Sequence, residues 1–289
     1  MLPGNATLQQ TRFTMERDLR KTYSEGEAKA VTRLILEHFG YPAALILREP
    51  SRQPGAEILT QIKEIVAEIH TGRPIQYILG YAYFSDLKIE VNENVLIPRP
   101  ETEEMVYRIV QSHPTPPAAI VDLGTGSGCI ALALKQHYPD ATVFGVDHQT
   151  GAIDVAKTNA RNNQLDVHWI EGDIHENLKL PSPGKIDLMV CNPPYVRESE
   201  RSLMHSNVKE HEPPEALFVS DTDPLVFYRS IARIGLELLS PGGTVWVEIN
   251  ERLGEETAGL FSAQGYHAAK VIRDIHEKER FISAIRPEF

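Results

Sequence analysis

Two short stretches of the chain combine residue types that could do chemistry together. The first is the glycine loop Gly124-Thr125-Gly126-Ser127-Gly128, which follows an apolar run and precedes a helical pattern. Glycines let the backbone approach a ligand closely, and a helix that begins there offers unpaired N–H groups. The spacing meets the dinucleotide-binding fingerprint only in part. The loop alone therefore predicts either a bound nucleoside or a turn that serves packing.

Acidic residues near this loop narrow the choice of ligand. Asp122 lies two residues before the first glycine, where a carboxylate would repel a pyrophosphate and suit a cation. Asp147 ends the next apolar run, 21 positions after Gly126, where an acid would accept hydrogen bonds from ribose hydroxyls. The two acids favour a cationic amino-acid nucleoside such as S-adenosylmethionine. Asp173, after the third apolar run, is either a partner for the adenine amino group or a solvated strand end.

The second stretch is Asn192-Pro193-Pro194-Tyr195, which follows a fourth apolar run. Prolines have no N–H, so their carbonyls remain available as acceptors, and the Asn192 side chain adds another. Two such acceptors can hold a poorly nucleophilic carboxamide or aromatic amino nitrogen and aim its lone pair at an electrophilic methyl. The Tyr195 ring offers a flat face for a planar group. The turn predicts direct methyl transfer to nitrogen, or more plainly a proline-stiffened loop with a structural tyrosine.

Both stretches need strand ends to hold them, and the rest of the chain supplies these. Short apolar runs alternate with helical patterns after residue 117, which predicts a mostly parallel sheet with helices on both faces. In that arrangement the two motifs face each other across a topological switch point. The predicted strands are Ala119–Leu123, Thr142–Val146, Val167–Ile170, Ile186–Cys191, Thr244–Ile249, Ala268–Ile272 and Arg280–Ile285.

The part before this sheet reads differently. Residues from about Thr7 to Thr71 show helical periodicity and indicate a small bundle. The pattern changes at Tyr81: apolar residues alternate with polar ones at Tyr83, Leu87, Ile89 and Val91, a turn follows at residues 92–94, and residues 95–97 form a second strand, which together predict a hairpin. We therefore expect a helical domain at residues 1–76, a hairpin linker at 77–104 and a catalytic domain at 105–289. Residues 192–223 show little periodicity and indicate a functional or mobile connection.

Composition limits the partners. The 289 residues include 29 Lys and Arg against 40 Asp and Glu, for a net charge of −11, which argues against binding driven by nucleic-acid phosphates. Two cysteines, Cys129 and Cys191, indicate free thiols in a reducing compartment. The charged first thirty residues and the short apolar runs predict neither a signal peptide nor a membrane span. We expect a cytoplasmic protein, and no spacing of His, Cys or acidic residues predicts a metal site.

Together the two motifs resemble the amino-methyltransferases that use S-adenosylmethionine and carry Asn-Pro-Pro-Tyr. Further strings narrow the resemblance to the release-factor glutamine methyltransferases, the HemK/PrmC family. They are Gly72-Arg73-Pro74-Ile75-Gln76-Tyr77-Ile78-Leu79-Gly80, Leu96-Ile97-Pro98-Arg99-Pro100-Glu101-Thr102-Glu103, Glu212-Pro213 and Leu239-Ser240-Pro241-Gly242-Gly243.

The resemblance implies a Rossmann-like methyltransferase domain with a seven-stranded sheet whose last strand is antiparallel. It implies methylation of the glutamine amide in the Gly-Gly-Gln motif of peptide-chain release factors. The acidic net charge and the short apolar runs add the expectation of no stable nucleic-acid partner and no membrane partner. The donor would meet Gly124–Gly128, Asp147, Asp173, Ile174 and Asn192, the glutamine would meet Asn192 to Tyr195, and Arg99 and Thr102 would lie nearby.

The chain departs from the family pattern in places, and other functions fit the same motifs. Ile174 stands where the family often has an aromatic residue, and Lys209 and His211 also depart from its pattern. One rival is a nucleic-acid amino-methyltransferase that acts on adenine N6 or guanine N2 through the same turn. Another is a non-catalytic S-adenosylmethionine-binding regulator. A nicotinamide dehydrogenase is disfavoured by the glycine spacing.

Overall fold

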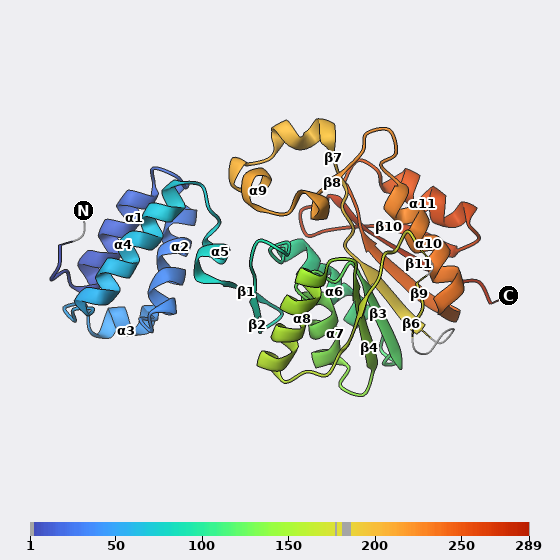
Figure 1. Cartoon of the computed structure of the whole chain (residues 1–289), viewed down its shortest axis with the longest axis horizontal. Coiled ribbons are helices and arrows are strands. Elements are labelled where there is room, and N and C mark those ends of the chain that lie inside the picture. The colour runs from blue at the N-terminus through green and yellow to red at the C-terminus, as the bar shows by residue number, and fades with distance from the viewer. Residues whose placement is uncertain (1–2, 177, 181–185, 289) are drawn as a thin grey trace. The chain divides into compact units, whose positions relative to one another are not determined.

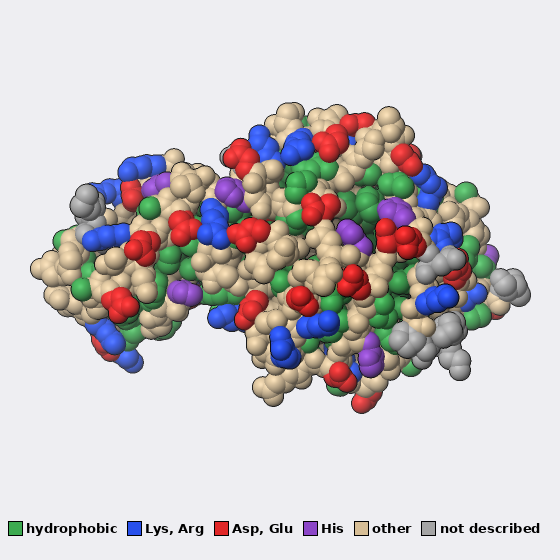
Figure 2. Space-filling model, in the orientation of Figure 1, with side chains coloured by type: hydrophobic (Ala, Val, Ile, Leu, Met, Phe, Trp, Pro, Cys, Tyr) green, Lys and Arg blue, Asp and Glu red, His purple; other side chains and the backbone are tan. Residues whose placement is uncertain are grey.

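The computed structural model describes residues 3–176, 178–180 and 186–288. The chain forms two compact units (Figure 1). Of the described residues, those up to Gly80 form the helical unit together with Ser206–His211, and those of Tyr81–His205 and from Glu212 onward form the sheet unit. On the visible face of the chain, acidic and basic side chains lie interspersed (Figure 2). Within the described residues, no helix is both long enough and apolar enough to cross a membrane.

The helical unit is built from amphipathic helices that bury one face each. Thr7 and Ser24 begin the first two helices with capping boxes, in which the side chain accepts from the third helical N–H. Buried Leu8, Met15 and Ile62 are part of its core. The helices are α1 (Leu8–Leu19), α2 (Glu25–His38), α3 (Ala43–Arg48), α4 (Ala56–His70) and α5 (Ile75–Leu79), joined by α9 (Ser206–His211) from far along the chain.

The predicted hairpin exists, but its predicted turn and second strand are wrong. Strands β1 (Tyr81–Phe84) and β2 (Leu87–Glu90) pair antiparallel across a two-residue turn at Ser85-Asp86, both of which have positive φ. This turn places Phe84 opposite Leu87 on one face, so no single alternation can run through both. Residues 95–97 form no strand and instead continue toward α6 (Pro100–Ser112).

The sheet has seven strands in the order β10-β11-β9-β6-β3-β4-β5, and the last strand of the chain, β11, runs antiparallel to both neighbours. The predicted seven strands and the antiparallel last strand are therefore confirmed. The strands are β3 (Ala119–Leu123), β4 (Thr142–Asp147), β5 (His168–Glu171), β6 (Ile186–Cys191), β9 (Leu239–Glu248), β10 (His267–Arg273) and β11 (Glu279–Ile285).

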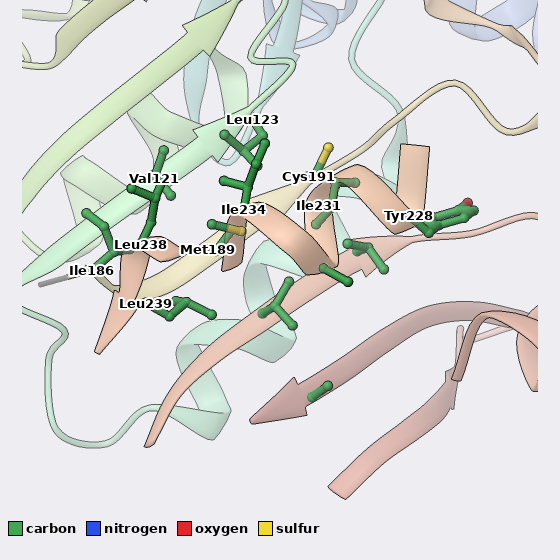
Figure 3. Close-up of a cluster of buried hydrophobic side chains, with 14 of the residues drawn as sticks. Val121, Leu123, Ile186, Met189, Cys191, Tyr228, Ile231, Ile234, Leu238 and Leu239 are labelled. Atoms are coloured by element: carbon green, nitrogen blue, oxygen red, sulfur yellow. The ribbon is translucent and has the colours of Figure 1, made fainter. Parts of the chain in front are cut away.

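Helices cover both faces of this sheet. On one face, Val121 and Leu123 of β3 and Met189 of β6 pack with Ile231 and Ile234 of α10 (Val226–Leu238) (Figure 3). That apolar cluster also includes Phe261 of α11 (Gly254–Ala263). α7 (Cys129–His137) and α8 (Thr150–Asn163) follow β3 and β4 as the crossovers to β4 and β5. α7 and α8 lead toward β5, at one edge of the sheet, whereas α10 leads from β6 to β9, toward the other edge. Because parallel crossovers are right-handed, α10 therefore covers the face opposite to α7 and α8.

Strand register brings the carboxyl ends of the strands into one line. Leu123 pairs with Cys191 and with Val146, Cys191 pairs with Val247, and Val146 pairs with Ile170. The residues one step beyond this row are Glu248, Asn192, Gly124, Asp147 and Glu171. Between β3 and β6 the chain changes direction across the sheet, so the switch point lies between Gly124 and Asn192.

The connection predicted at residues 192–223 is ordered into short elements. It contains β7 (Val196–Arg197) and β8 (Phe218–Val219), which pair in parallel, and two short 3-10 helices. These helices are η1 (Glu198–Leu203) and η2 (Pro214–Ala216). Pieces this short carry no periodicity of their own, which is why the sequence pattern gave no assignment.

Candidate active site

A cavity of about 260 Å³ opens beside the carboxyl ends of β3, β4 and β6. Twelve of the fourteen predicted site residues line it: Gly124, Thr125, Gly126, Ser127, Asp147, Asp173, Ile174, Asn192, Pro193, Pro194, Arg99 and Thr102. Gly128 and Tyr195 lie outside its lining. The structure thus brings both sequence motifs to one cavity in the sheet unit.

The glycine loop needs its glycines for backbone conformation and for space. Gly124, Gly126 and Gly128 all have positive φ, which side-chain-bearing residues rarely adopt. A Cβ on Gly128 would come within 2.8 Å of the Trp169 ring. The Thr125 N–H donates to the Val146 carbonyl at 2.8 Å, which ties the loop to β4. Gly128 then caps the N-terminus of α7 without being part of the cavity wall.

Asp122 braces this loop from beneath. It is buried, and its Oδ2 accepts from Thr125 Oγ1 at 2.6 Å and from the Ala131 N–H at 3.2 Å in the first turn of α7. Its Oδ1 is buried without a hydrogen-bond partner among the described residues. Burial raises the pKa of Asp122 to about 7, against the opposing effect of these hydrogen bonds. The carboxyl therefore supports the loop and is not part of the cavity wall.

Asp147 reaches the cavity from the end of β4. Its Oδ2 accepts from the Gly126 N–H at 2.9 Å, and its Oδ1 accepts from the Gln149 N–H at 3.0 Å. Each carboxylate oxygen has a further lone pair, so the side chain can accept two hydroxyl donors while the loop stays in place. Asp147 thus links the glycine loop to the ligand-facing wall.

The Asn192 turn is held by side chains from two other elements. Asn192 Nδ2 donates to Thr102 Oγ1 of α6 at 3.0 Å, and Tyr195 OH donates to Glu248 Oε1 of β9 at 2.9 Å. Asn250 Nδ2 donates to the Tyr195 carbonyl at 3.1 Å, which fixes the backbone beyond the prolines. Burial, followed by the neighbouring Glu248 charge, raises the pKa of Tyr195 well above its ordinary value. Tyr195 therefore remains a neutral phenol.

Glu248 is a residue that sequence reasoning missed. Its carboxylate is buried and accepts from Thr102 Oγ1 at 2.7 Å as well as from Tyr195. A signal was present, because Glu248 follows the apolar Val245-Trp246-Val247 just as Asn192 follows Met189-Val190-Cys191. An acid at the buried end of a central strand has to be paired.

Arg99 lines the cavity, but its charge is already balanced. Its guanidinium donates to Glu212 Oε1 at 2.5 Å, and Glu212 Oε2 accepts from the Ile97 N–H at 3.1 Å. The Glu212 side chain is 1% exposed, against 29% for Arg99. The pair joins the segment before α6 to the segment before η2. Arg99 therefore supports the cavity wall, and its charge is balanced by Glu212 before any ligand binds.

Four further lining residues come from positions that the sequence patterns did not single out. Gln149 Nε2 donates to Glu215 Oε1 at 3.0 Å, so the loop after β4 contacts η2 at the cavity. The rings of His175 and Phe227 lie 5.0 Å apart beside Ile174. Phe227 is the second residue of α10 and follows an irregular stretch, so only the fold brings its ring to this wall.

The sheet order and the cavity define a class, the Rossmann-like methyltransferases. A methyltransferase from Pyrococcus furiosus has a similar structure, with a TM-score of 0.51 and 16% identity over 80% of this chain and 99% of that chain. An rRNA methyltransferase from Thermus thermophilus also has a TM-score of 0.51, at 15% identity over 71% of this chain and 49% of that chain. At such identities the likeness concerns the fold.

Sequence comparison identifies the family. Residues 14–80 match the PrmC N-terminal domain, and residues 105–211 match the methyltransferase small domain. The chain is 38% identical to the release factor glutamine methyltransferase of Flavobacterium psychrophilum over 91% of its length and 94% of the relative. Identity to the enzyme of the same name from Bacteroides thetaiotaomicron is 37%, over 94% of this chain and 98% of that one. The chain therefore belongs to the release factor glutamine methyltransferase family.

Proposed function

We propose that this protein transfers a methyl group from S-adenosylmethionine to the side-chain amide nitrogen of the glutamine in the Gly-Gly-Gln motif of peptide-chain release factors. Family membership supports this substrate. The observation that carries the chemistry is the position of Asn192, which lies in the cavity wall beside the glycine loop with its Nδ2 engaged by Thr102. Its side-chain carbonyl is then available to accept from an amide.

The residues around the cavity fit a nucleoside methyl donor. The loop Gly124–Gly128 and Asp147 would hold its polar groups, because Asp147 keeps acceptor capacity beyond its two backbone bonds. Asp173 would accept from the adenine amino group, with Ile174 and Phe227 as apolar neighbours. When bound, the donor supplies an electrophilic methyl group.

The chain's own residues then position the nitrogen. Asn192 Oδ1 and the Pro193 carbonyl each accept one N–H of the target amide, which fixes its plane and directs its lone pair. Pro194 stiffens the turn, and Tyr195 closes it with its hydroxyl anchored on Glu248. Neither carbonyl removes a proton, so the proton leaves to water during or after transfer.

A protein substrate suits the rest of the molecule. The net charge is −11, and the visible face mixes acidic and basic side chains (Figure 2), whereas phosphate-driven binding needs clustered cations. We assign partner recognition to residues 1–76, with residues 77–104 as linker and 105–289 as the methyltransferase domain.

The test is mass spectrometry of release factor after incubation with the protein and S-adenosylmethionine. The Gly-Gly-Gln peptide should gain one methyl group, and Asn192→Ala should lower kcat by about 10²–10³-fold through loss of one placed acceptor. Asn162→Ala removes an exposed amide that contacts Glu90 on the hairpin and serves as the matched control. Total RNA and DNA are included as competing acceptors. An unmodified peptide, or methylation of nucleic acid alone, would contradict the proposal.

A further inference from the structure

We propose that Glu248, acting through Thr102, sets which way the Asn192 side-chain amide faces and is thereby a positioning residue for methyl transfer. This inference rests on the proposed function, because it explains how Asn192 presents an acceptor to the target amide. The three side chains come from β9, α6 and the turn after β6. Residues so far apart in sequence meet because Val247 pairs with Cys191, so Glu248 and Asn192 each lie one residue beyond that pair.

The contacts form a directed chain. Asn192 Nδ2 lies 3.0 Å from Thr102 Oγ1, and Thr102 Oγ1 lies 2.7 Å from Glu248 Oε2. The other carboxylate oxygen, Oε1, accepts from Tyr195 OH at 2.9 Å. Glu248 and Thr102 are 1% and 3% exposed, so these groups have no bulk water to exchange with.

Hydrogen-bond polarity follows from the chemistry of each group. An ionised carboxylate only accepts, so the single hydroxyl proton of Thr102 goes to Glu248. Thr102 Oγ1 can then only accept from Asn192, which requires that the NH₂ end of the amide faces it. Asn192 Oδ1 consequently faces away from Thr102. The shape of an asparagine amide does not show which end is oxygen and which is nitrogen. Here the orientation of the Asn192 amide is determined by Glu248, two hydrogen bonds away.

The electrostatic surroundings suit this role. Burial raises the pKa of Glu248, and the hydrogen bonds from Thr102 and Tyr195 oppose that rise by favouring the ionised carboxylate. The positive charge of Arg280 acts in the same direction as these hydrogen bonds, from β11 next to Phe281, the residue that pairs with Glu248. A buried acid kept only for stability would be a poor choice, because an apolar side chain of similar volume generally stabilises a core as well or better. The carboxylate instead receives two hydroxyl donors, and each belongs to or contacts the Asn192 turn.

Four variants separate positioning from structural support. Thr102→Val keeps the shape and removes the hydroxyl, whereas Thr102→Ser keeps the hydroxyl. Glu248→Gln lets a side-chain NH₂ donate to Thr102, so the Thr102 proton becomes free to face Asn192. Tyr228→Phe is the matched control, because Tyr228 OH is buried and donates at 3.2 Å to the backbone carbonyl of Glu248 and not to its carboxylate.

We expect kcat on release factor to fall about 30-fold in T102V and in E248Q, as displacement of a reacting group implies, with KM for S-adenosylmethionine within about 3-fold. T102S and Y228F should stay within about 3-fold of wild type. The double variant T102V/E248Q should fall no further than the worse single variant, because both break one chain. Wild-type kcat in T102V, or multiplicative losses in the double variant, would overturn the inference.

A second measurement does not depend on turnover. In ligand-free protein, the Asn192 side-chain NH₂ protons, assigned by their loss in Asn192→Ala, should exchange slowly in wild type and T102S and quickly in T102V. Equal exchange in all three refutes the directed chain. If wild-type protein leaves release factor unmodified, the proposed function fails, while the exchange data still decide the role of Thr102 and Glu248.

Discussion

Asp122→Asn is the substitution whose effect should depend most clearly on pH. Asp122 is buried under the glycine loop, and its pKa is raised from 3.8 to about 7, mainly by burial. In the unfolded chain the group ionises near pH 4, but in the folded protein it stays protonated until about pH 7. The contribution of Asp122 to the free energy of unfolding is therefore largest below about pH 4 and declines as the pH rises toward 7. Above about pH 7 it no longer changes with pH.

The magnitude follows from the size of the shift. A change from 3.8 to about 7, at about 1.36 kcal/mol per pKa unit, corresponds to about 4 kcal/mol in total. About 3 kcal/mol of this falls between pH 5 and pH 8. An asparagine can keep an acceptor for Thr125 Oγ1 and the Ala131 N–H, and its NH₂ would occupy the place of the unpartnered Oδ1. That buried NH₂ costs about 1–3 kcal/mol at every pH. The test is therefore how the difference in unfolding free energy changes with pH, and not its value at any one pH.

Tryptophan fluorescence gives a clean assay. The two tryptophans of the chain, Trp169 on β5 and Trp246 on β9, both belong to the sheet unit, so their signal reports the unit that contains Asp122. Urea unfolding of ligand-free D122N and wild type at several pH values gives the difference in unfolding free energy. This difference should move by about 3 kcal/mol in favour of D122N from pH 5 to pH 8. Asp140→Asn, at an exposed turn, controls for the loss of one charge. A pH-independent difference for D122N would refute the reasoning.

Two further pairs of variants test the walls of the cavity. Gly128→Ala should destabilise the sheet unit by about 3 kcal/mol, because the φ of Gly128 is +82° and a Cβ there would meet the Trp169 ring. The control Gly259→Ala lies in open space on α11 and should stabilise the unit by about 0.5–1 kcal/mol. Urea unfolding compares the two variants, and equal effects would contradict the steric argument. Arg99→Met leaves the buried Glu212 carboxylate without its cation and should cost about 3 kcal/mol. Glu212→Gln keeps one acceptor oxygen for the buried Ile97 N–H, while the partly exposed Arg99 can turn toward water, so it should cost only about 1 kcal/mol. The reverse order in thermal unfolding would show that Glu212 does not depend on Arg99.

The sheet and its motifs were predictable because their signals are local. Each central strand is a continuous apolar run, and each motif begins where such a run ends, as Leu123 precedes Gly124 and Cys191 precedes Asn192. Parallel topology then requires these ends to lie on one edge. The register that pairs Leu123 with Cys191 confirms the predicted approach of the two motifs at the switch point.

What escaped prediction depends on contacts between distant segments. The hairpin turn was misplaced because Asn92 and Asn94 are strong turn formers, whereas Ser85 and Asp86 adopt positive φ without a glycine. Glu248 was read as the interior of a strand, since nothing in the sequence reveals that Thr102 and Tyr195 donate to it. Such partners are set by tertiary packing, which periodicity does not encode.

Register also explains why this site tolerates little change in strand length. Glu248, Asn192, Gly124 and Asp147 all lie one residue beyond a single paired row, and successive residues of a strand point to opposite faces. One residue inserted into β6 before Cys191 would either move Asn192 away from Thr102 or turn the apolar side chains of β6 from one face to the other. With the extra residue, no single register of β6 could keep both its apolar side chains in the core and Asn192 beside Thr102. The apolar packing that stabilises β6 therefore also determines where the acceptor for the target nitrogen lies.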